Sequence, residues 1–264
     1  RETLRERIGV DVGTRLPIED AIEWAGAHDV RYIDVRLADR LDDGFDDAEA
    51  AAIRDACDEN DVELGLHTLS AVNVAETAPI VRDAVEEYLR AYVDAAARLD
   101  ARHVVVHGGY HFTGDAEERI EAGIALLDRA FAEARERDVR LLLENHNPEP
   151  DAAEVHYVPT SPAEFERFLD ALDPDWAFNP PHANLDPAGI AGFADAFPLE
   201  RCGEVRLNDN RGTHEEHLPP GEGTIDFAAL FDRLEGVYDG PYVLAWGTLD
   251  DMLDGREYLL EVAR

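Results

Sequence analysis

Histidines and carboxylates gather in one short polar stretch near the end of the chain. The segment VRLNDNRGTHEEHLPPGEG (205–223) begins as an apolar run and then carries Asp209, Glu215 and His217. Side chains of these types bind divalent metals and move protons. At the end of the apolar run, however, the side chain expected to enter a pocket is Arg206, a permanent cation. The segment therefore raises the question of what supplies the positive charge of this site.

Polar side chains end other apolar runs in the same way. His67 ends LGLH, His107 ends HVVVH, Glu144 ends LLLE and Asn179 ends WAFN, with His182 three residues later. A lone histidine after a strand orders a loop more often than it binds a ligand. Five consecutive runs that end in His, His, Glu, Asn and Arg instead predict one shared pocket. The residues two positions before the first four of these ends, Gly65, Val105, Leu142 and Ala177, are small or branched and apolar, as in a barrel interior.

These polar ends belong to eight short apolar runs with the length and composition of buried strands. The predicted strands are residues 8–12, 32–35, 62–67, 103–107, 140–144, 176–179, 204–207 and 242–245. The predicted helices are residues 17–27, 48–59, 78–99, 115–137, a segment from 162 onward, 187–197, 226–234 and 250–262. Eight strand–helix units predict an α/β chain that forms a single (β/α)8 barrel over residues 1–264. A doubly wound sheet is the alternative, but it favours a GxGxxG loop that the first strand lacks.

The composition is extremely acidic. Asp and Glu number 59 against 24 basic residues, a formal net charge of −35, and every basic residue is an arginine. Molar salt shortens the Debye length to about 3 Å and would screen this repulsion, so we expect a high-salt cytoplasmic protein without a membrane span. The lack of lysine excludes Schiff-base chemistry. We expect Cys57 and Cys202 to be packed thiols.

At the residues quoted above, the chain resembles the xylose isomerase-like superfamily, which includes sugar 3-epimerases, hydroxypyruvate isomerases and endonuclease IV. The resemblance runs from about Ile8 to the C-terminus. Its most specific parts are His67 with Asn73, VVVHGG, LEN, NPPHANL and EEHLPPGEGTIDF. It implies a sugar isomerase or epimerase that moves a proton beside the carbonyl of a small polyol, sugar or sugar acid.

The resemblance also implies a divalent ion on Glu, Asp, His and Glu, and this set is altered here. Glu144 matches the first ligand, but Asn179, Arg206 and Ala245 stand at the other three positions. Two acids are lost and one cation is gained, so the buried charges still nearly balance. We therefore expect Arg206 to take the place of the ion and to pair with Glu144.

Positions that match the two flanking ions of endonuclease IV are better kept. His67, His107 and Glu144 match one group, and this His2Glu set predicts a relocated zinc or manganese site as the weaker variant. The other group is matched by His182, Glu215 and His217, with Glu where Asp is usual.

Three functions follow from these residues. In an active isomerase or epimerase, Glu144 would be the base, His182 would orient the substrate and Arg206 would stabilise the oxyanion. The predicted contacts with a sugar-like ligand are His67, His107, Asn179, Asp209, His217 and Trp246. The alternative is a catalytically inactive, ligand-binding pseudoenzyme. DNA repair is the minor alternative, because we see no arginine cluster with interleaved aromatics for binding nucleic acid. The sequence leaves the substrate, the reaction direction and the oligomeric state open.

Overall fold

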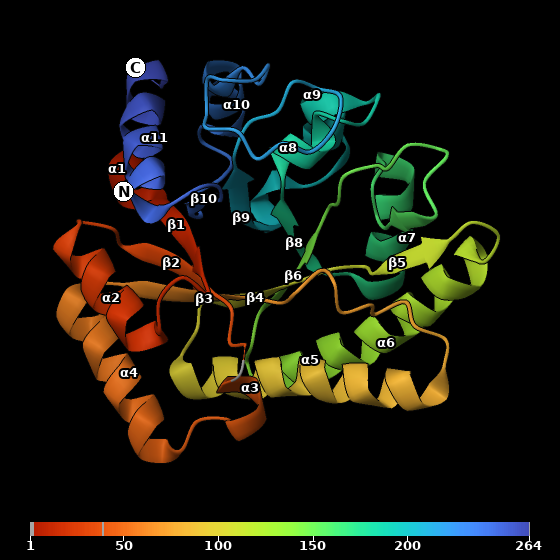
Figure 1. The fold of residues 1–264 in the computed structure, drawn as a ribbon, viewed down its shortest axis with the longest axis horizontal. Coiled ribbons are helices and arrows are strands. Elements are labelled where there is room, and N and C mark those ends of the chain that lie inside the picture. Colours follow the sequence, from red (N-terminus) through yellow and green to blue (C-terminus); the bar gives the residue numbers. More distant parts are fainter. Residues whose placement is uncertain (1–2, 39, 264) are drawn as a thin grey trace.

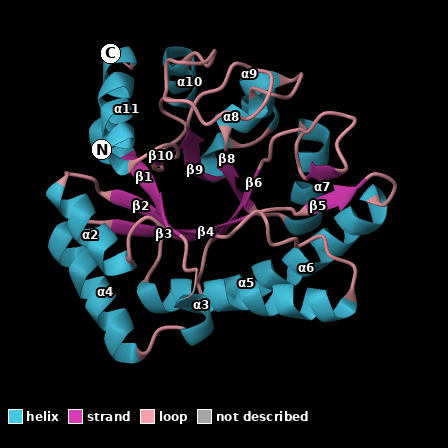
Figure 2. Ribbon diagram, viewed as in Figure 1, coloured by secondary structure: helices cyan, strands magenta, loops and turns pink. Residues whose placement is uncertain are grey.

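Eight parallel strands form a closed barrel in this computed structural model, which describes residues 3–38 and 40–263 (Figure 1). The order around the barrel is β1-β10-β9-β8-β6-β4-β3-β2, so the last strand closes the sheet onto the first (Figure 2). The barrel strands are β1 (Ile8–Gly13), β2 (Tyr32–Val35), β3 (Glu63–His67), β4 (His103–Val106), β6 (Leu141–Glu144), β8 (Asp175–Phe178), β9 (Cys202–Leu207) and β10 (Tyr242–Leu244).

Helices follow every barrel strand and cover the outside of the sheet (Figure 1). They are α2 (Ile18–Ala27), α4 (Asp47–Asn60), α5 (Pro79–Leu99), α6 (Ala116–Glu136), α7 (Pro162–Leu172), α9 (Gly189–Ala196), α10 (Phe227–Leu234) and α11 (Leu249–Val262). The predicted (β/α)8 barrel is confirmed, and each predicted strand and helix has a counterpart. Among the described residues, no helix has the length and apolarity needed to cross a membrane.

Several short elements are absent from the sequence prediction. They are helices α1 (Leu4–Arg7), α3 (Arg40–Asp43) and α8 (Pro180–Ala183), the 3-10 turn η1 (Leu199–Arg201), and an antiparallel pair of β5 (Tyr110–Phe112) with β7 (Val155–Tyr157). Three or four residues are too few to show a helical or strand period. The β5–β7 pair also joins segments more than forty residues apart, which no local signal reveals.

Local capping explains several helix boundaries. Ser161 Oγ accepts a hydrogen bond from the amide of Glu164 at the start of α7, as the sequence predicts. Asp46 caps α4 and forms a reciprocal capping box with Glu49. These caps fix where each helix departs from its loop, and so they fix the lengths of the loops above the barrel.

The barrel interior is apolar in its middle layer. Val105, Leu142 and Ala177 form a fully buried cluster, as strand alternation predicts. Gly65 has no side chain because the hydroxyl end of Tyr32 fills that place inside the barrel. Polar side chains therefore cluster at the carboxyl ends of the strands. A second group of polar side chains lies inside the barrel near β2.

Candidate functional site

A cavity of about 580 Å³ opens at the carboxyl ends of the barrel strands. The sequence-predicted residues that line it are His67, His107, Glu144, Asn179, His182, Arg206, Glu215, His217 and Trp246. They come from loops and strand ends that span more than half of the chain. The barrel geometry thus brings together every predicted site residue except Asp209.

Arg206 lies on the floor of this cavity, almost fully buried, and its guanidinium is held by carboxylates. Nη2 donates to Asp11 Oδ2 at 2.6 Å, and Nη1 donates to Asp34 Oδ2 at 2.7 Å and to Glu204 Oε1 at 3.0 Å. The expected partner Glu144 is farther away, with 3.9 Å between its Oε2 and Arg206 Nε. The principal partners of Arg206 are therefore three acids that the sequence prediction did not single out.

The hydrogen bond between Arg206 and His67 determines which nitrogen of the imidazole carries the proton. Arg206 Nη1 lies 3.0 Å from His67 Nδ1. A guanidinium only donates, so Nδ1 must accept, and a neutral His67 then carries its proton on Nε2. Burial and the charge of Arg206 hold the pKa of His67 well below its usual value, so the ring is neutral. His67 Nε2 is therefore a donor at the edge of the cavity, with His107 Nε2 as its partner at 3.2 Å.

Glu144 presents one free oxygen to the cavity. Asn179 Nδ2 donates to Glu144 Oε1 at 2.8 Å, whereas Oε2 has no hydrogen-bond partner among the described residues. Burial alone would raise the pKa of Glu144, but the neighbouring His67, Arg206 and His182 lower it below its usual value. The result is an ionised carboxylate with an unpaired buried oxygen, a group suited to accept a proton or a cation.

His182 forms an acid–base pair with Glu215. His182 Nε2 lies 3.0 Å from Glu215 Oε1, and its Nδ1 lies 2.8 Å from the backbone oxygen of Asn145. Burial lowers the pKa of His182, but Glu215 more than compensates and the pKa is raised. The pKa of Glu215 falls to about 2 despite its burial, because His182 hydrogen-bonds to it. His217 reaches the same Glu215 oxygen from the loop.

The first predicted metal set is compact, but its hydrogen bonds do not suit an ion. The donor atoms of His67, His107 and Glu144 all lie within 4.8 Å of one another, and the two Nε2 atoms are 3.2 Å apart. A histidine that binds zinc normally donates its other ring N–H to an acceptor, which leaves the coordinating nitrogen bare. At His67 the arrangement is reversed, because Arg206 donates to Nδ1 and leaves the proton on Nε2. The distances therefore fit a metal and the tautomer does not.

The second predicted set, His182, Glu215 and His217, is closed on itself by hydrogen bonds to one Glu215 oxygen. Among the described residues, the other compact group is Asp34, His67 and Glu204. Arg206 Nη1 already lies within hydrogen-bond distance of one atom of each member of that group. A guanidinium nitrogen thus occupies the place where a cation would sit.

The prediction that Asp209 contacts ligand is wrong. Asp209 is fully buried and does not line the cavity. Its carboxylate accepts hydrogen bonds from four backbone amides, those of Asn210, Gly221, Gly223 and Ile225. Its role is to fold the loop after β9. The sequence pattern did not separate this role from ligand binding because both place an acid just after a strand.

A polar chain continues below Arg206 into the barrel. Glu204 Oε2 lies 2.7 Å from His103 Nε2, which lies 2.8 Å from the Tyr32 hydroxyl. Burial, followed by the charge of Asp34, raises the pKa of Glu204 well above its usual value. The signal for this layer is present in the sequence. Glu204 stands two residues before Arg206 on the same face of the strand.

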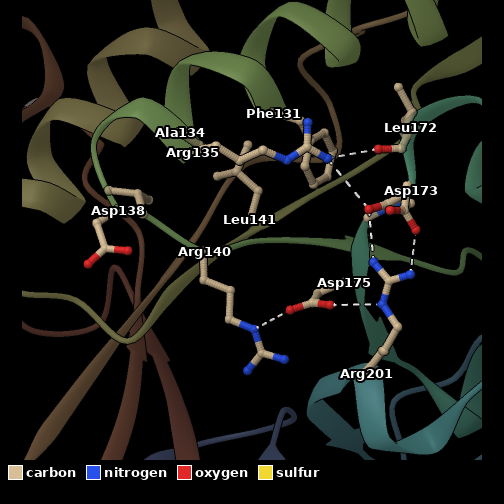
Figure 3. A pocket seen from close by; sticks show the side chains of 12 residues that line it. Phe131, Ala134, Arg135, Asp138, Arg140, Leu141, Leu172, Asp173, Asp175 and Arg201 are labelled. Carbon is tan, nitrogen blue, oxygen red and sulfur yellow. Dashed lines mark hydrogen bonds and ion pairs between the residues drawn. The ribbon is translucent and has the colours of Figure 1, made fainter.

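A larger hollow of about 770 Å³ lies at the amino ends of β6 and β8 (Figure 3). Arg140 and Arg201 both pair there with Asp175, and Arg135 donates to the backbone oxygen of Leu172. Figure 3 shows these guanidinium groups turned toward aspartates and carbonyl oxygens. This end of a barrel usually serves stability rather than chemistry, and the paired charges agree with that role.

Comparison with known proteins identifies the family. The model of the xylose isomerase-like TIM barrel matches residues 22–262. The chain belongs to this family. A curated relative from Natronomonas pharaonis named "Probable endonuclease 4" is 31% identical over 246 residues, covering 84% of this chain and 83% of that protein. An uncharacterised protein of Methanocaldococcus jannaschii is 28% identical over 212 residues, covering 77% of this chain and 71% of that protein.

Solved structures of this xylose isomerase-like fold cover nearly the whole chain. A D-tagatose 3-epimerase-like protein superposes with a TM-score of 0.83 at 22% identity, covering 97% of both chains. Endonuclease IV from Thermus thermophilus superposes with a TM-score of 0.75 at 20% identity, covering 97% of this chain and 98% of that one. An epimerase-like protein and an endonuclease thus share the scaffold. The chemistry must be argued from the cavity.

Proposed function

We propose that this protein is an isomerase or epimerase of small sugars that moves a proton beside a carbonyl, with Arg206 in place of the family's metal ion. The observation that carries the proposal is the pairing of Glu144 with His182 on one wall of the cavity, where Glu144 Oε1 lies 3.7 Å from His182 Nδ1. One group is an ionised base and the other a histidine with a raised pKa. Proton transfer beside a carbonyl requires such a pair.

The base role falls to Glu144 Oε2. Asn179 holds the other oxygen of this carboxylate, so only Oε2 is free to take a proton from carbon. The lowered pKa keeps this carboxylate ionised, so it is ready to accept a proton. Arg206 Nε, 3.9 Å away, stabilises the ionised form before the reaction starts.

The acid role falls to His182, supported by Glu215. A protonated His182 can give a proton to an oxygen that becomes negative as the C–H bond breaks. His67 adds a second donor, because Arg206 holds its proton on Nε2. The residues of this chain therefore offer one base and two donors around the same cavity.

The family resemblance implies a divalent ion, which would polarise the carbonyl oxygen if it were bound. His67, His107 and Glu144 would be its ligands. Binding would require His67 to lose its Nε2 proton and Arg206 to give up its hydrogen bond to Nδ1. We therefore assign no step to an ion.

The test is hydrogen exchange in D2O, followed by NMR, with D-fructose, D-psicose, D-tagatose and a keto-sugar acid such as 5-keto-D-gluconate. We expect deuterium at the carbon beside the carbonyl of at least one compound, and a drop of about 10²–10⁴-fold in the Glu144→Gln variant. The matched control is Glu149→Gln, because Glu149 is a carboxylate that lines the same cavity but lies outside the proposed pair. No exchange with any compound would leave the pseudoenzyme as the better description.

DNA cleavage is the second candidate, because the Natronomonas pharaonis relative is named as an endonuclease. The two reactions make different demands on the cavity, because hydrolysis of a phosphodiester does not require a base placed beside a carbonyl group. Incubation with a duplex containing one abasic site separates the two. Strand cleavage that disappears in His107→Ala would favour the endonuclease.

A further inference from the structure

The walls of the cavity carry different charges, with three glutamates on one side and two arginines, next to Asp11, on the other. Glu144, Glu149 and Glu215 line the side formed by the segments after β6 and β9. Arg15 and Arg36 line the side formed by the ends of β1 and β2, beside Trp246 and Gly247 after β10. A ligand in this cavity therefore meets two different charged environments at its two ends.

Arg15 is held rigidly and carries a charge that no carboxylate balances. Its Nη1 donates to the backbone oxygens of Asp11 and Val12 at 3.1 and 3.3 Å, and its Nη2 donates to that of Gly247 at 2.9 Å. Within residues 3–38 and 40–263, no acidic side chain forms an ion pair with Arg15. Backbone oxygens fix its direction without neutralising it, so the positive charge stays available to a ligand.

Arg36 adds a second guanidinium close by. A Cβ placed on Gly13 would lie 2.8 Å from Arg36 Nη1, 3.2 Å from Asp11 Oδ1 and 3.4 Å from Arg15 Nη1, so the two guanidinium groups converge beside this carboxylate. Gly13 has φ +59° and leaves this space empty. Arg36 Nη2 donates to Asp11 Oδ2 at 3.1 Å, an oxygen that Arg206 also uses. One carboxylate is thus shared by two guanidinium groups.

Two of the three arginines on this wall are already paired with acids. Arg206 is held by Asp11, Asp34 and Glu204, and Arg36 shares Asp11. Arg15, in contrast, donates to backbone oxygens. The field also reaches the centre of the cavity, since Arg36 is among the groups that lower the pKa values of His67 and His107. In a chain of net charge −35, such a wall is unusual.

Ala245 adds no negative charge to this wall of the cavity. It lines the cavity next to Trp246, and it stands where the family resemblance places a carboxylate ligand. Its methyl group leaves room that a carboxylate side chain would fill, in a cavity that Arg15 and Arg36 also line.

We propose that Arg15 and Arg36 bind the carboxylate of an acidic sugar, whose uncharged carbons then extend toward Glu144 and His182. One guanidinium without an acidic partner among the described residues, that of Arg15, matches a carboxylate monoanion better than a phosphate dianion. This inference rests on the proposed function for the position of the reacting end and names its substrate class, a sugar acid rather than a neutral sugar.

The experiment is calorimetric titration at constant ionic strength with three probes, D-gluconate, D-glucitol and D-glucose 6-phosphate. We expect gluconate to bind at least tenfold more tightly than glucitol, and more tightly than the phosphate. Arg15→Gln and Arg36→Gln should each reduce the gluconate preference to near unity. Arg90→Gln, an arginine of α5 that pairs with Glu86 and Glu133 on the outer surface, should retain it.

The inference fails if wild-type protein binds gluconate and glucitol equally, if neither binds, if the phosphate binds best, or if the preference survives in both cavity variants. Arg15→Gln alone also removes backbone contacts, so Arg36→Gln keeps the test valid if the first variant unfolds. The readout is separate from catalysis. If the protein prefers gluconate but catalyses no C–H exchange in D2O, this inference holds and the proposed function fails. If it catalyses exchange on neutral sugars but shows no preference for gluconate, the proposed function holds and this inference fails.

Discussion

Arg206 Nη1 lies 3.0 Å from His67 Nδ1, and this contact decides the hydrogen-bond character of the whole cavity floor. In a metal site, the group behind a ligating histidine accepts a hydrogen bond from the N–H of the far ring nitrogen. Here Arg206, the group behind His67, donates a hydrogen bond instead, so the cavity-facing nitrogen of His67 is a donor and not a ligand. One buried cation thus supplies positive charge and also removes a place for an ion.

Removal of the guanidinium should destabilise the fold. In Arg206→Met, the acids Asp11 and Asp34 lose their buried partner, and we expect the free energy of unfolding to fall by about 3–5 kcal/mol. Denaturant unfolding in molar KCl measures this loss. Arg90→Gln, on the surface, should change stability by less than about 1 kcal/mol. Equal effects of the two substitutions would contradict a central role for the buried network.

The same substitution should improve metal binding. Without Arg206, His67 can carry its proton on Nδ1, so Nε2 becomes free for zinc beside His107 and Glu144. Elemental analysis of protein purified without chelator should find more zinc in Arg206→Met than in the wild type, and His107→Ala in that background should remove it. The triple change Arg206→His, Asn179→Asp and Ala245→Glu should bind most strongly. One equivalent of zinc in the wild type would show that the hydrogen-bond argument is wrong.

The pH profile of catalysis should depend on Glu215. This residue raises the pKa of His182, so Glu215→Gln should lower it and His182 should lose its proton at a lower pH. If protonated His182 is the acid, the alkaline limb of kcat/KM moves to lower pH in the variant. Asp186→Asn, a control after α8, should leave the limb in place. An unchanged limb in Glu215→Gln would exclude His182 as the acid.

Stability should fall as the pH is lowered from about 6.5 to about 4, in part through His103. Burial lowers the pKa of His103 in the folded chain to about 4, against about 6.5 when unfolded. Within this window the unfolded state binds the extra proton, so stability is present above the window and is lost as the pH falls. The contribution is on the order of 3 kcal/mol. His103→Gln should show a shallower dependence in denaturant titrations, and an identical slope would refute this assignment.

Asp209 should prove structural. Asp209→Ala leaves four backbone amides without their acceptor, and we expect a loss of roughly 2–4 kcal/mol in unfolding free energy. Amides 221–225 should also exchange faster with solvent. Where Asp209→Asn remains folded, its gluconate affinity should equal that of the wild type. A selective loss of affinity with unchanged stability would restore the predicted contact with ligand.

Much of this molecule follows from its sequence alone. Alternating apolar runs and helical periods predicted every barrel strand, because buried parallel strands must be apolar and short. Polar residues at consecutive strand ends predicted the cavity, since those ends meet in any such barrel. Local pattern thus determined the fold and nine of the residues that line the cavity, but it did not indicate Asp11, Arg15 or Arg36.

Tertiary structure decided how the site residues are used. The sequence placed Arg206 in the cavity but matched it with Glu144, whereas closure of the barrel brings Asp11 and Asp34 from distant strands to its guanidinium. Hydrogen-bond direction, and with it the proton position on His67, depends on distances of a few tenths of an ångström between segments far apart in the chain. No local pattern encodes such distances, which arise only when the sheet closes.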